Sequence, residues 1–284
     1  MGVLWGVFDV SEPPVLILHA EARHRLEPPP PEREDQWVVR LQDTLVPAVL
    51  LHPTLHETHV LLGRCEAANE DGILMMYQNV DVPAVRAKFG GGYVGANLAT
   101  QGYLLGQEAI RRFDLKKGDK AVVMVPIGDY SRAQREDNVR IAFEEHGMEV
   151  VVLDGTPEYA TDPNSAIPVI SAALAANSDA KILVHTGGQM LGNAETFAVA
   201  AGYGPNELLQ IGFDTSPQVM SGFVNGFVHL TSDQQPFLQG YLPVLSLCQM
   251  KVMGLGALNQ DTGAGFVTTE NYESVMSLAN AGLR

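Results

Sequence analysis

The chain has 284 residues, of which 46% are hydrophobic and 18% charged, a balance typical of folded globular domains. Its formal net charge of −15 argues against a nucleic-acid partner, because such a surface repels phosphate backbones. Two cysteines are too few for a disulfide framework, and no apolar run reaches the length of about 20 residues that a membrane span needs.

The first 35 residues are interrupted by prolines at Pro13-Pro14 and across Pro28–Pro31, which neither continue a helix nor pair in a sheet. We expect at most one strand there, over Leu4–Val10, and a short helix around His19–Arg25. The opening residues lack the basic segment and the small-residue cleavage site of a secretory signal.

From about residue 45 onward, short apolar runs alternate with helical stretches. Because these runs are continuously hydrophobic, they indicate strands that are buried on both faces, as in a parallel sheet covered by helices. The runs are 48–51, 73–77, 121–125, 150–153, 181–184 and 209–213.

Helical periodicity appears between the runs. Residues 134–146 place apolar side chains on one face and end at Gly147, and residues 166–176 follow a helix-start signal at 162–165. A further apolar helix extends from Phe237 to about residue 255. This alternation of strands and helices predicts a doubly wound α/β fold.

The pattern breaks at three places, where we expect the chain to cross between two lobes: near 114–118, 232–236 and 263–268. The prediction is therefore two doubly wound parallel-sheet lobes joined by three crossovers. The N-terminal lobe is predicted to comprise 1–115 and 234–263, and the C-terminal lobe 116–233 and 264–284.

Three stretches carry a family resemblance: Tyr93–Gly106, then Ile211–Pro217 with Thr231–Tyr241, and Gly72–Pro83. Together they resemble the type I periplasmic sugar-binding proteins, the group that contains ribose-, galactose- and autoinducer-binding receptors of ABC importers. The resemblance covers about residues 36–284 and implies two α/β lobes that close on a ligand by a hinge. The ligand is expected in the interlobe cleft, at the carboxyl ends of the strands.

The resemblance also implies a set of ligand-binding residues, most of which directly follow a strand. The candidates are Asn79, Asp81, Asn97, Arg135, Thr186, Asp214 and Gln234.

Several of these candidates have an alternative role. The Asp214 carboxylate can accept sugar hydroxyls or can cap the following helix. A planar guanidinium suits paired hydroxyls, which favours Arg135, with Arg132 as its competitor. Asn97 can serve only as a helix cap, and Gln234 can be a hinge residue bonded only to backbone.

Two positions depart from the family pattern. Asn79 is followed by Val80, where many relatives have an aspartate followed by an arginine, and Thr186 stands where relatives usually carry Asn-Asp. Gln189 is the candidate that would replace the missing amide. These departures argue against transferring the sugar specificity of a relative to this chain.

Other kinds of site find little support in the sequence. Gly90–Gly95 satisfies G-x-G-x-x-G but does not lie between a strand and a helix, as a dinucleotide site requires. His52, His56 and His59 lack a second ligand cluster and are interpreted as surface histidines. We therefore expect no metal, no cofactor and, since no P-loop or nucleophile elbow occurs, no enzyme activity.

The expected function is that of a monomeric solute-binding receptor for a small sugar or sugar-like polyol, with the membrane subunits of an ABC importer as partners. Its expected location is the periplasm, or tethered outside the cell, with the export signal absent from this chain. The alternative is the effector-binding core of a lac-repressor-family regulator that lacks its DNA-binding module. Residues 1–45 are acidic-to-mixed and proline-interrupted, which does not fit a basic helix-turn-helix.

Overall fold

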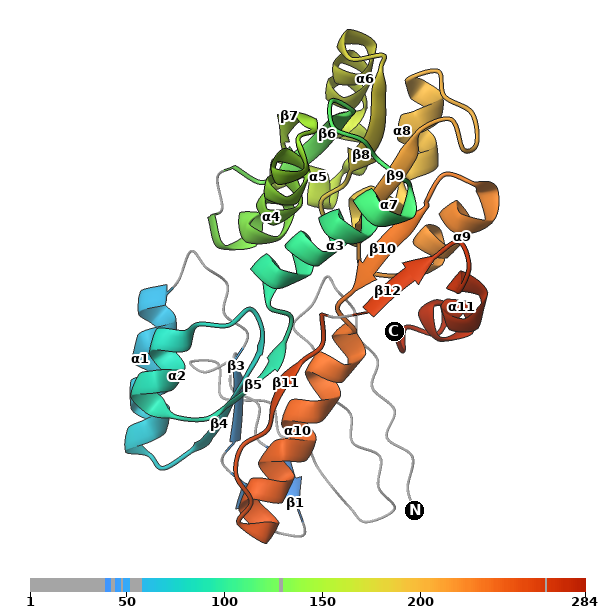
Figure 1. The fold of residues 1–284 in the computed structure, drawn as a ribbon. Coiled ribbons are helices and arrows are strands. Elements are labelled where there is room, and N and C mark those ends of the chain that lie inside the picture. Colours follow the sequence, from blue (N-terminus) through green and yellow to red (C-terminus); the bar gives the residue numbers. More distant parts are fainter. Residues whose placement is uncertain (1–38, 42–43, 47, 52–57, 128–129, 264) are drawn as a thin grey trace. The chain divides into compact units, whose positions relative to one another are not determined.

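The computed structural model describes residues 39–41, 44–46, 48–51, 58–127, 130–263 and 265–284 (Figure 1). The chain divides into two units. Unit 1 comprises the chain up to Gly95 together with Leu238–Gln260, and unit 2 comprises Ala96–Phe237 with Asp261–Arg284. The strand and helix predicted within the first 35 residues lie outside the described residues, as do His52 and His56.

Unit 1 is built on a four-stranded sheet in the order β11-β5-β4-β3, in which β3, β4 and β5 are parallel. These strands are β3 (Ala48–Leu51), β4 (Leu74–Asn79), β5 (Gly92–Gly95) and β11 (Asn259–Asp261). A separate antiparallel pair consists of β1 (Val39–Leu41) and β2 (Thr44–Val46). The helices are α1 (Thr58–Glu70), α2 (Pro83–Phe89) and α10 (Pro236–Met253).

The two faces of the unit 1 sheet bury different side chains because successive strand residues point to opposite sides. Met75 and Tyr77 of β4 pack with Cys65 of α1 and Val85 of α2. Met76, between them, packs on the other face with Val94 and with residues of α10 such as Leu247. The continuous apolar run predicted at 73–77 is therefore a strand covered by helices on both faces, as expected.

Unit 2 contains a six-stranded sheet in the order β12-β10-β9-β8-β6-β7. All its neighbours are parallel except β12, which pairs antiparallel with β10. The strands are β6 (Lys120–Val125), β7 (Glu149–Asp154), β8 (Ala180–Val184), β9 (Leu209–Phe213), β10 (Leu230–Asp233) and β12 (Gly265–Thr268).

The helices of unit 2 cover both faces of this sheet (Figure 1). They are α3 (Leu98–Arg112), α4 (Tyr130–His146), α5 (Glu158–Thr161), the 3₁₀ helix η3 (Pro163–Ala166), α6 (Ile167–Ala176), α7 (Gly187–Gly192), α8 (Ala194–Ala200), α9 (Pro217–Asn225) and α11 (Tyr272–Asn280). Val123 of β6 packs on the side of α3 and α4, whereas Val122 and Met124 pack on the side of α6 and α8. This confirms the doubly wound α/β fold.

The division into units differs from the predicted lobes mainly at its first boundary. The chain passes between units after Gly95, after Phe237 and after Gln260. The sequence interpretation placed residues up to 115 in the N-terminal lobe, but α3 belongs to unit 2. The physical reason is that α3 packs along α4, with Leu105 and Ala109 in the same core as Val139 and Phe143. No helix of the described residues is long and apolar enough to cross a bilayer.

A chain of buried polar side chains crosses the sheet of unit 2. The ring Nε2 of His185 lies 2.9 Å from Gln210 Oε1, and the backbone N–H of Gln210 donates to Nδ1 of His229 at 3.1 Å. His185 is 0% exposed, and burial lowers its pKa to about 4, while its hydrogen bond to Gln210 works in the opposite direction. Burial also lowers the pKa of His229.

This arrangement predicts a loss of stability in acid. Between pH 6.5 and about 4 the unfolded chain binds a proton that native His185 does not, so stability falls as the pH falls through that window. The expected loss is about 3 kcal/mol. Urea unfolding followed by circular dichroism at several pH values measures it. In His185→Gln the pH dependence between 6.5 and 4 should become shallower, and an identical slope in both proteins would show that His185 is not its source.

Candidate functional site

The end of β9 presents a carboxylate from a strained backbone position. Asp214 directly follows the strand and has φ of +68°, which is rare for a non-glycine residue and occurs often at functional sites. The following helix α9 is capped by Ser216, whose Oγ accepts from the backbone N–H of Val219 at 3.1 Å. The capping role that the sequence left open for Asp214 therefore belongs to Ser216.

Arg135 of α4 brings a guanidinium to the same place. Its Cζ lies over the Phe213 ring at 4.1 Å from the ring centre, a cation–π contact. Its Nη1 lies 3.9 Å from Asp214 Oδ2, which is an ion pair but too long for a direct hydrogen bond. The guanidinium and the carboxylate thus lie side by side without a direct hydrogen bond between Nη1 and Oδ2.

Glu136 holds the other side of this guanidinium. Its Oε1 accepts from Arg135 Nε at 3.2 Å and from Nη2 at 3.1 Å. The Glu136 side chain is 2% exposed and the Arg135 side chain 14% exposed. Glu136 is not among the predicted site residues, because it lies in a strongly polar helical stretch, which is typical of a solvent-facing surface.

Asp214 is further held by Gln234 and by the backbone of α7. The Gln234 side chain and the Gly188 backbone both lie close enough to the carboxylate to lower its pKa, against the rise that burial causes. Asp233, fully buried, accepts from the backbone N–H of Gln235 at 2.8 Å and from Arg284 Nε at 2.7 Å, which fixes the backbone on either side of Gln234. The structure therefore brings three predicted residues together: Arg135, Asp214 and Gln234.

The electrostatics of this cluster depend on burial and on the single cation. Burial raises the pKa of Asp214 and of Glu136, and the Arg135 charge opposes the shift in both. Burial alone would lower the pKa of Arg135, but the charges of Glu136 and then Asp214 outweigh it and raise that pKa. Among the described residues, Asp214 Oδ1 and Glu136 Oε2 are buried and accept no hydrogen bond. Asp214 Oδ1 is thus an acceptor that suits a hydroxyl donor.

Comparison with known families identifies the domain. A family model for the periplasmic binding protein domain matches residues 55–254. The chain belongs to this family.

Individual relatives differ in how much they share with this periplasmic binding protein. The chain is 27% identical over 197 residues to the xylose/arabinose-binding protein XylF of Sulfolobus acidocaldarius. The aligned region covers 64% of this chain and 45% of XylF. The chain thus spans less than half of that relative's length.

Solved structures share the fold at low sequence identity. A carbohydrate transporter from Acidothermus cellulolyticus in complex with myo-inositol has a TM-score of 0.68 and 20% identity, covering 84% of this chain and 79% of that one. A protein from Bacteroides fragilis, assigned as a LacI transcriptional regulator, has a TM-score of 0.63 and 18% identity, covering 80% and 77%. Both confirm the predicted fold class, and neither by itself separates receptor from regulator.

The remaining ligand-binding candidates in unit 2 of this periplasmic binding protein are Thr186, Asn97 and Arg132. Thr186 follows β8 and precedes Gly187, where a Cβ would lie 3.8 Å from Arg135 Nη2. Asn97 is exposed, and its side-chain oxygen accepts from the Thr100 backbone N–H at 3.1 Å, so it caps α3. The side chain of Arg132, the competitor of Arg135, lies outside the described part of the chain. Ligand contacts by Thr186 and Asn97 stay predictions.

Two candidates belong to unit 1. Asn79 ends β4 with φ of +65°, and its Nδ2 donates to Gln239 Oε1 at 3.0 Å. Asn79 in unit 1 and Asp214 in unit 2 thus share a positive φ at the carboxyl end of a strand. Asp81 accepts from Arg86 Nε and Nη2, both at 2.7 Å. The Asp81 carboxylate thus forms an ion pair with Arg86. A ligand contact by Asp81 stays a prediction.

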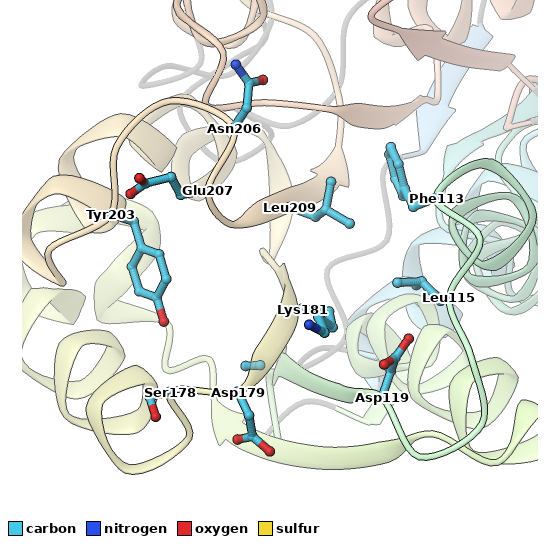
Figure 2. Close-up of a pocket in the computed structure, with 11 residues that line it drawn as sticks. Phe113, Leu115, Asp119, Ser178, Asp179, Lys181, Tyr203, Asn206, Glu207 and Leu209 are labelled. Atoms are coloured by element: carbon cyan, nitrogen blue, oxygen red, sulfur yellow. The ribbon is translucent and has the colours of Figure 1, made fainter.

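A cavity of about 400 Å³ lies elsewhere in unit 2 and contains none of the predicted residues. Asp119, Ala180 and Leu209, at the amino ends of β6, β8 and β9, contribute to its lining. Figure 2 shows Lys181 and Leu209 between Phe113 on one side and Tyr203 on the other. Since open α/β sheets bind ligands at the carboxyl ends of their strands, we do not place the candidate ligand site in this cavity.

Proposed function

We propose that this chain is a solute-binding receptor that binds a small, uncharged sugar or polyol and catalyses no reaction. The observation that carries the proposal is the pair formed by Arg135 Nη1 and Asp214 Oδ2, 3.9 Å apart at the carboxyl end of β9. A hydroxyl group accepts from one and donates to the other, and adjacent hydroxyls on a sugar ring extend this pattern to the neighbouring acceptors. Charged partners make such hydrogen bonds stronger than neutral ones.

The charge balance of the cluster favours an uncharged ligand. Two carboxylates, Glu136 and Asp214, surround the guanidinium of Arg135, so the cation is already matched by anionic groups. An anionic ligand would have to displace one of them. The names of the relatives point the same way, since one is a xylose/arabinose-binding protein and another holds myo-inositol.

We assign the remaining predicted residues and partners to the same proposal. We propose as further ligand contacts Asn79, Asp81, Asn97, Thr186 and Gln234. Asn79 is supported by its position at the end of β4, and Gln234 by its position close to the Asp214 carboxylate. The proposed partners are the membrane subunits of an ABC importer, and the proposed state is a monomer in the periplasm or tethered outside the cell. The chain's membership of the periplasmic binding protein family supports this location.

The regulator alternative rests on a shared fold, which the Bacteroides fragilis structure exemplifies. The relative found by sequence over 197 residues is a sugar-binding protein. This relative supports the receptor over the regulator core.

The test is calorimetric titration and thermal shift with xylose, arabinose and myo-inositol, and with glucuronate as the anionic comparison. A ligand at about 100 times its Kd should stabilise the native state by about 2.7 kcal/mol. A shift with a neutral compound and none with glucuronate supports the proposal. The absence of a shift with every neutral compound contradicts it.

Asp214→Asn tests the carboxylate within that experiment. Asparagine tolerates the positive φ, so the substitution removes charge with little added strain. We expect the affinity for the bound sugar to fall at least about tenfold, while the midpoint of thermal unfolding changes little. Asp154→Asn, at the end of the edge strand β7, is the matched control and should leave affinity unchanged. Equal affinities in Asp214→Asn and the unsubstituted protein would remove Asp214 from the site.

A further inference from the structure

Glu136 is a buried charged residue to which neither the family pattern nor the proposed ligand contacts give a role. It lies on α4 immediately after Arg135. Consecutive residues on a helix point in different directions and do not ordinarily face each other. Here the guanidinium nevertheless turns back, so that both Nε and Nη2 donate to one oxygen, Glu136 Oε1.

Because Arg135 and Glu136 are both largely buried, losing the contact between them is energetically costly. Glu136 is 2% exposed on its side chain, and taking a carboxylate out of water is costly unless a cation and hydrogen bonds compensate. The compensation comes from Arg135. Glu136 therefore constrains the orientation of the guanidinium more strongly than an exposed partner would, because the alternative leaves a buried charge without its cation.

The constraint decides which donors of Arg135 are left for a ligand. Nε and one hydrogen of Nη2 are engaged by Glu136, which leaves both hydrogens of Nη1 and the second hydrogen of Nη2, and Cζ lies over the Phe213 ring at 4.1 Å from its centre. Nη1 is then the nitrogen directed to Asp214 Oδ2, at 3.9 Å. A guanidinium held on one edge by a carboxylate and on one face by a ring presents its remaining edge in a single direction.

We propose that Glu136 is a positioning residue that orients Arg135 for sugar binding without contacting the sugar itself. The proposal rests on the proposed function, since it assigns to Glu136 a role in that same site. It also makes a statement about the sugar-free protein, namely that the Arg135 guanidinium is already fixed before ligand arrives.

The first measurement uses the sugar-free protein. In the ¹⁵N NMR spectrum, the Nε–H signal of Arg135 should be resolved and should exchange slowly with solvent. Glu136→Ala should abolish this signal, whereas Glu136→Gln, which retains the Oε1 acceptor, should retain it at a shifted position. Asp137→Ala is the matched control, because Asp137 pairs with Arg140 instead and should leave the Arg135 signal in place. An unchanged Arg135 signal in Glu136→Ala would overturn the proposal.

The second measurement is the affinity for xylose in a double-mutant cycle with Arg135→Ala. Glu136→Ala should weaken xylose binding about tenfold in the unsubstituted background and by less than about twofold when Arg135 is absent. Glu136→Gln should restore most of the affinity. An equal loss in both backgrounds would show that Glu136 does not act through Arg135 and would contradict the proposal.

The two measurements also separate this inference from the proposed function. If xylose and the other neutral sugars fail to bind the unsubstituted protein, the proposed function is wrong, but the NMR signal of Arg135 still decides whether Glu136 holds the guanidinium. If xylose binds and the cycle shows no coupling, the receptor function stands and the positioning role of Glu136 is wrong.

Discussion

Replacing Gly102 by alanine is expected to destabilise unit 2 by about 3 kcal/mol, although the same change usually stabilises a helix. Gly102 lies on α3, where a Cβ would stand 1.8 Å from the backbone oxygen of Arg135 on α4. A backbone atom cannot rotate away as a side chain can, so α3 and α4 would have to separate. The loss of their close packing outweighs the gain in helix propensity. Urea unfolding followed by circular dichroism measures the change.

Two other helical glycines provide matched controls for Gly102→Ala. A Cβ at Gly106 would stand 2.7 Å from the Cβ of Ala142, so Gly106→Ala should cost less than Gly102→Ala because the overlap is smaller than the approach to 1.8 Å at Gly102. A Cβ at Gly63 of α1 meets nothing within 4 Å, and Gly63→Ala should stabilise the protein by about 1 kcal/mol. Equal effects at Gly102 and Gly63 would show that the approach of α3 to α4 is not limiting.

The central strands could be predicted because burial on both faces imposes a continuous apolar run. The predicted runs at 121–125 and 209–213 correspond to β6 (Lys120–Val125) and to β9. The marginal strands could not be predicted in the same way. β10 (Leu230–Asp233) ends in Thr-Ser-Asp and was not predicted as a strand, and its last two residues fall in the break predicted at 232–236. Its polar side chains are stabilised by tertiary contacts such as Gln101 Nε2 to Ser232 Oγ at 3.0 Å.

The candidate site was predictable only where a residue type is tied to a strand end. Asp214 follows an apolar run directly, and the family resemblance drew attention to it and to Gln234. Glu136 gave no such signal, because a charged residue in a polar helix normally faces water. Its burial depends on where α4 packs and on the turn of the Arg135 side chain, which are tertiary facts. A periodicity of 3.6 residues predicts which face of a helix is buried. It does not predict the conformation of a long side chain.

Arg135→Lys is expected to weaken sugar binding about 100-fold with only a small loss of stability. Lysine keeps the positive charge between Glu136 and Asp214, so neither carboxylate loses its cation. It lacks the planar fork that donates to Glu136 on one edge while presenting Nη1 on the other, and it cannot place a guanidinium carbon over the Phe213 ring.

We expect Arg135→Ala to be less stable than Arg135→Lys, whereas the two variants should have similar affinities for the sugar. Removing the cation leaves two buried carboxylates beside each other, which costs about 3–5 kcal/mol in comparable buried pairs. Arg140→Lys is the matched control on the same helix, because Arg140 pairs with Asp137 and Glu144 near the surface at 2.7 and 2.6 Å and should affect neither property strongly. Calorimetric titration with the best-binding neutral sugar, alongside urea unfolding, distinguishes these cases. If Arg135→Lys binds as tightly as the unsubstituted protein, charge alone accounts for the role of Arg135, and the geometric argument for the site fails.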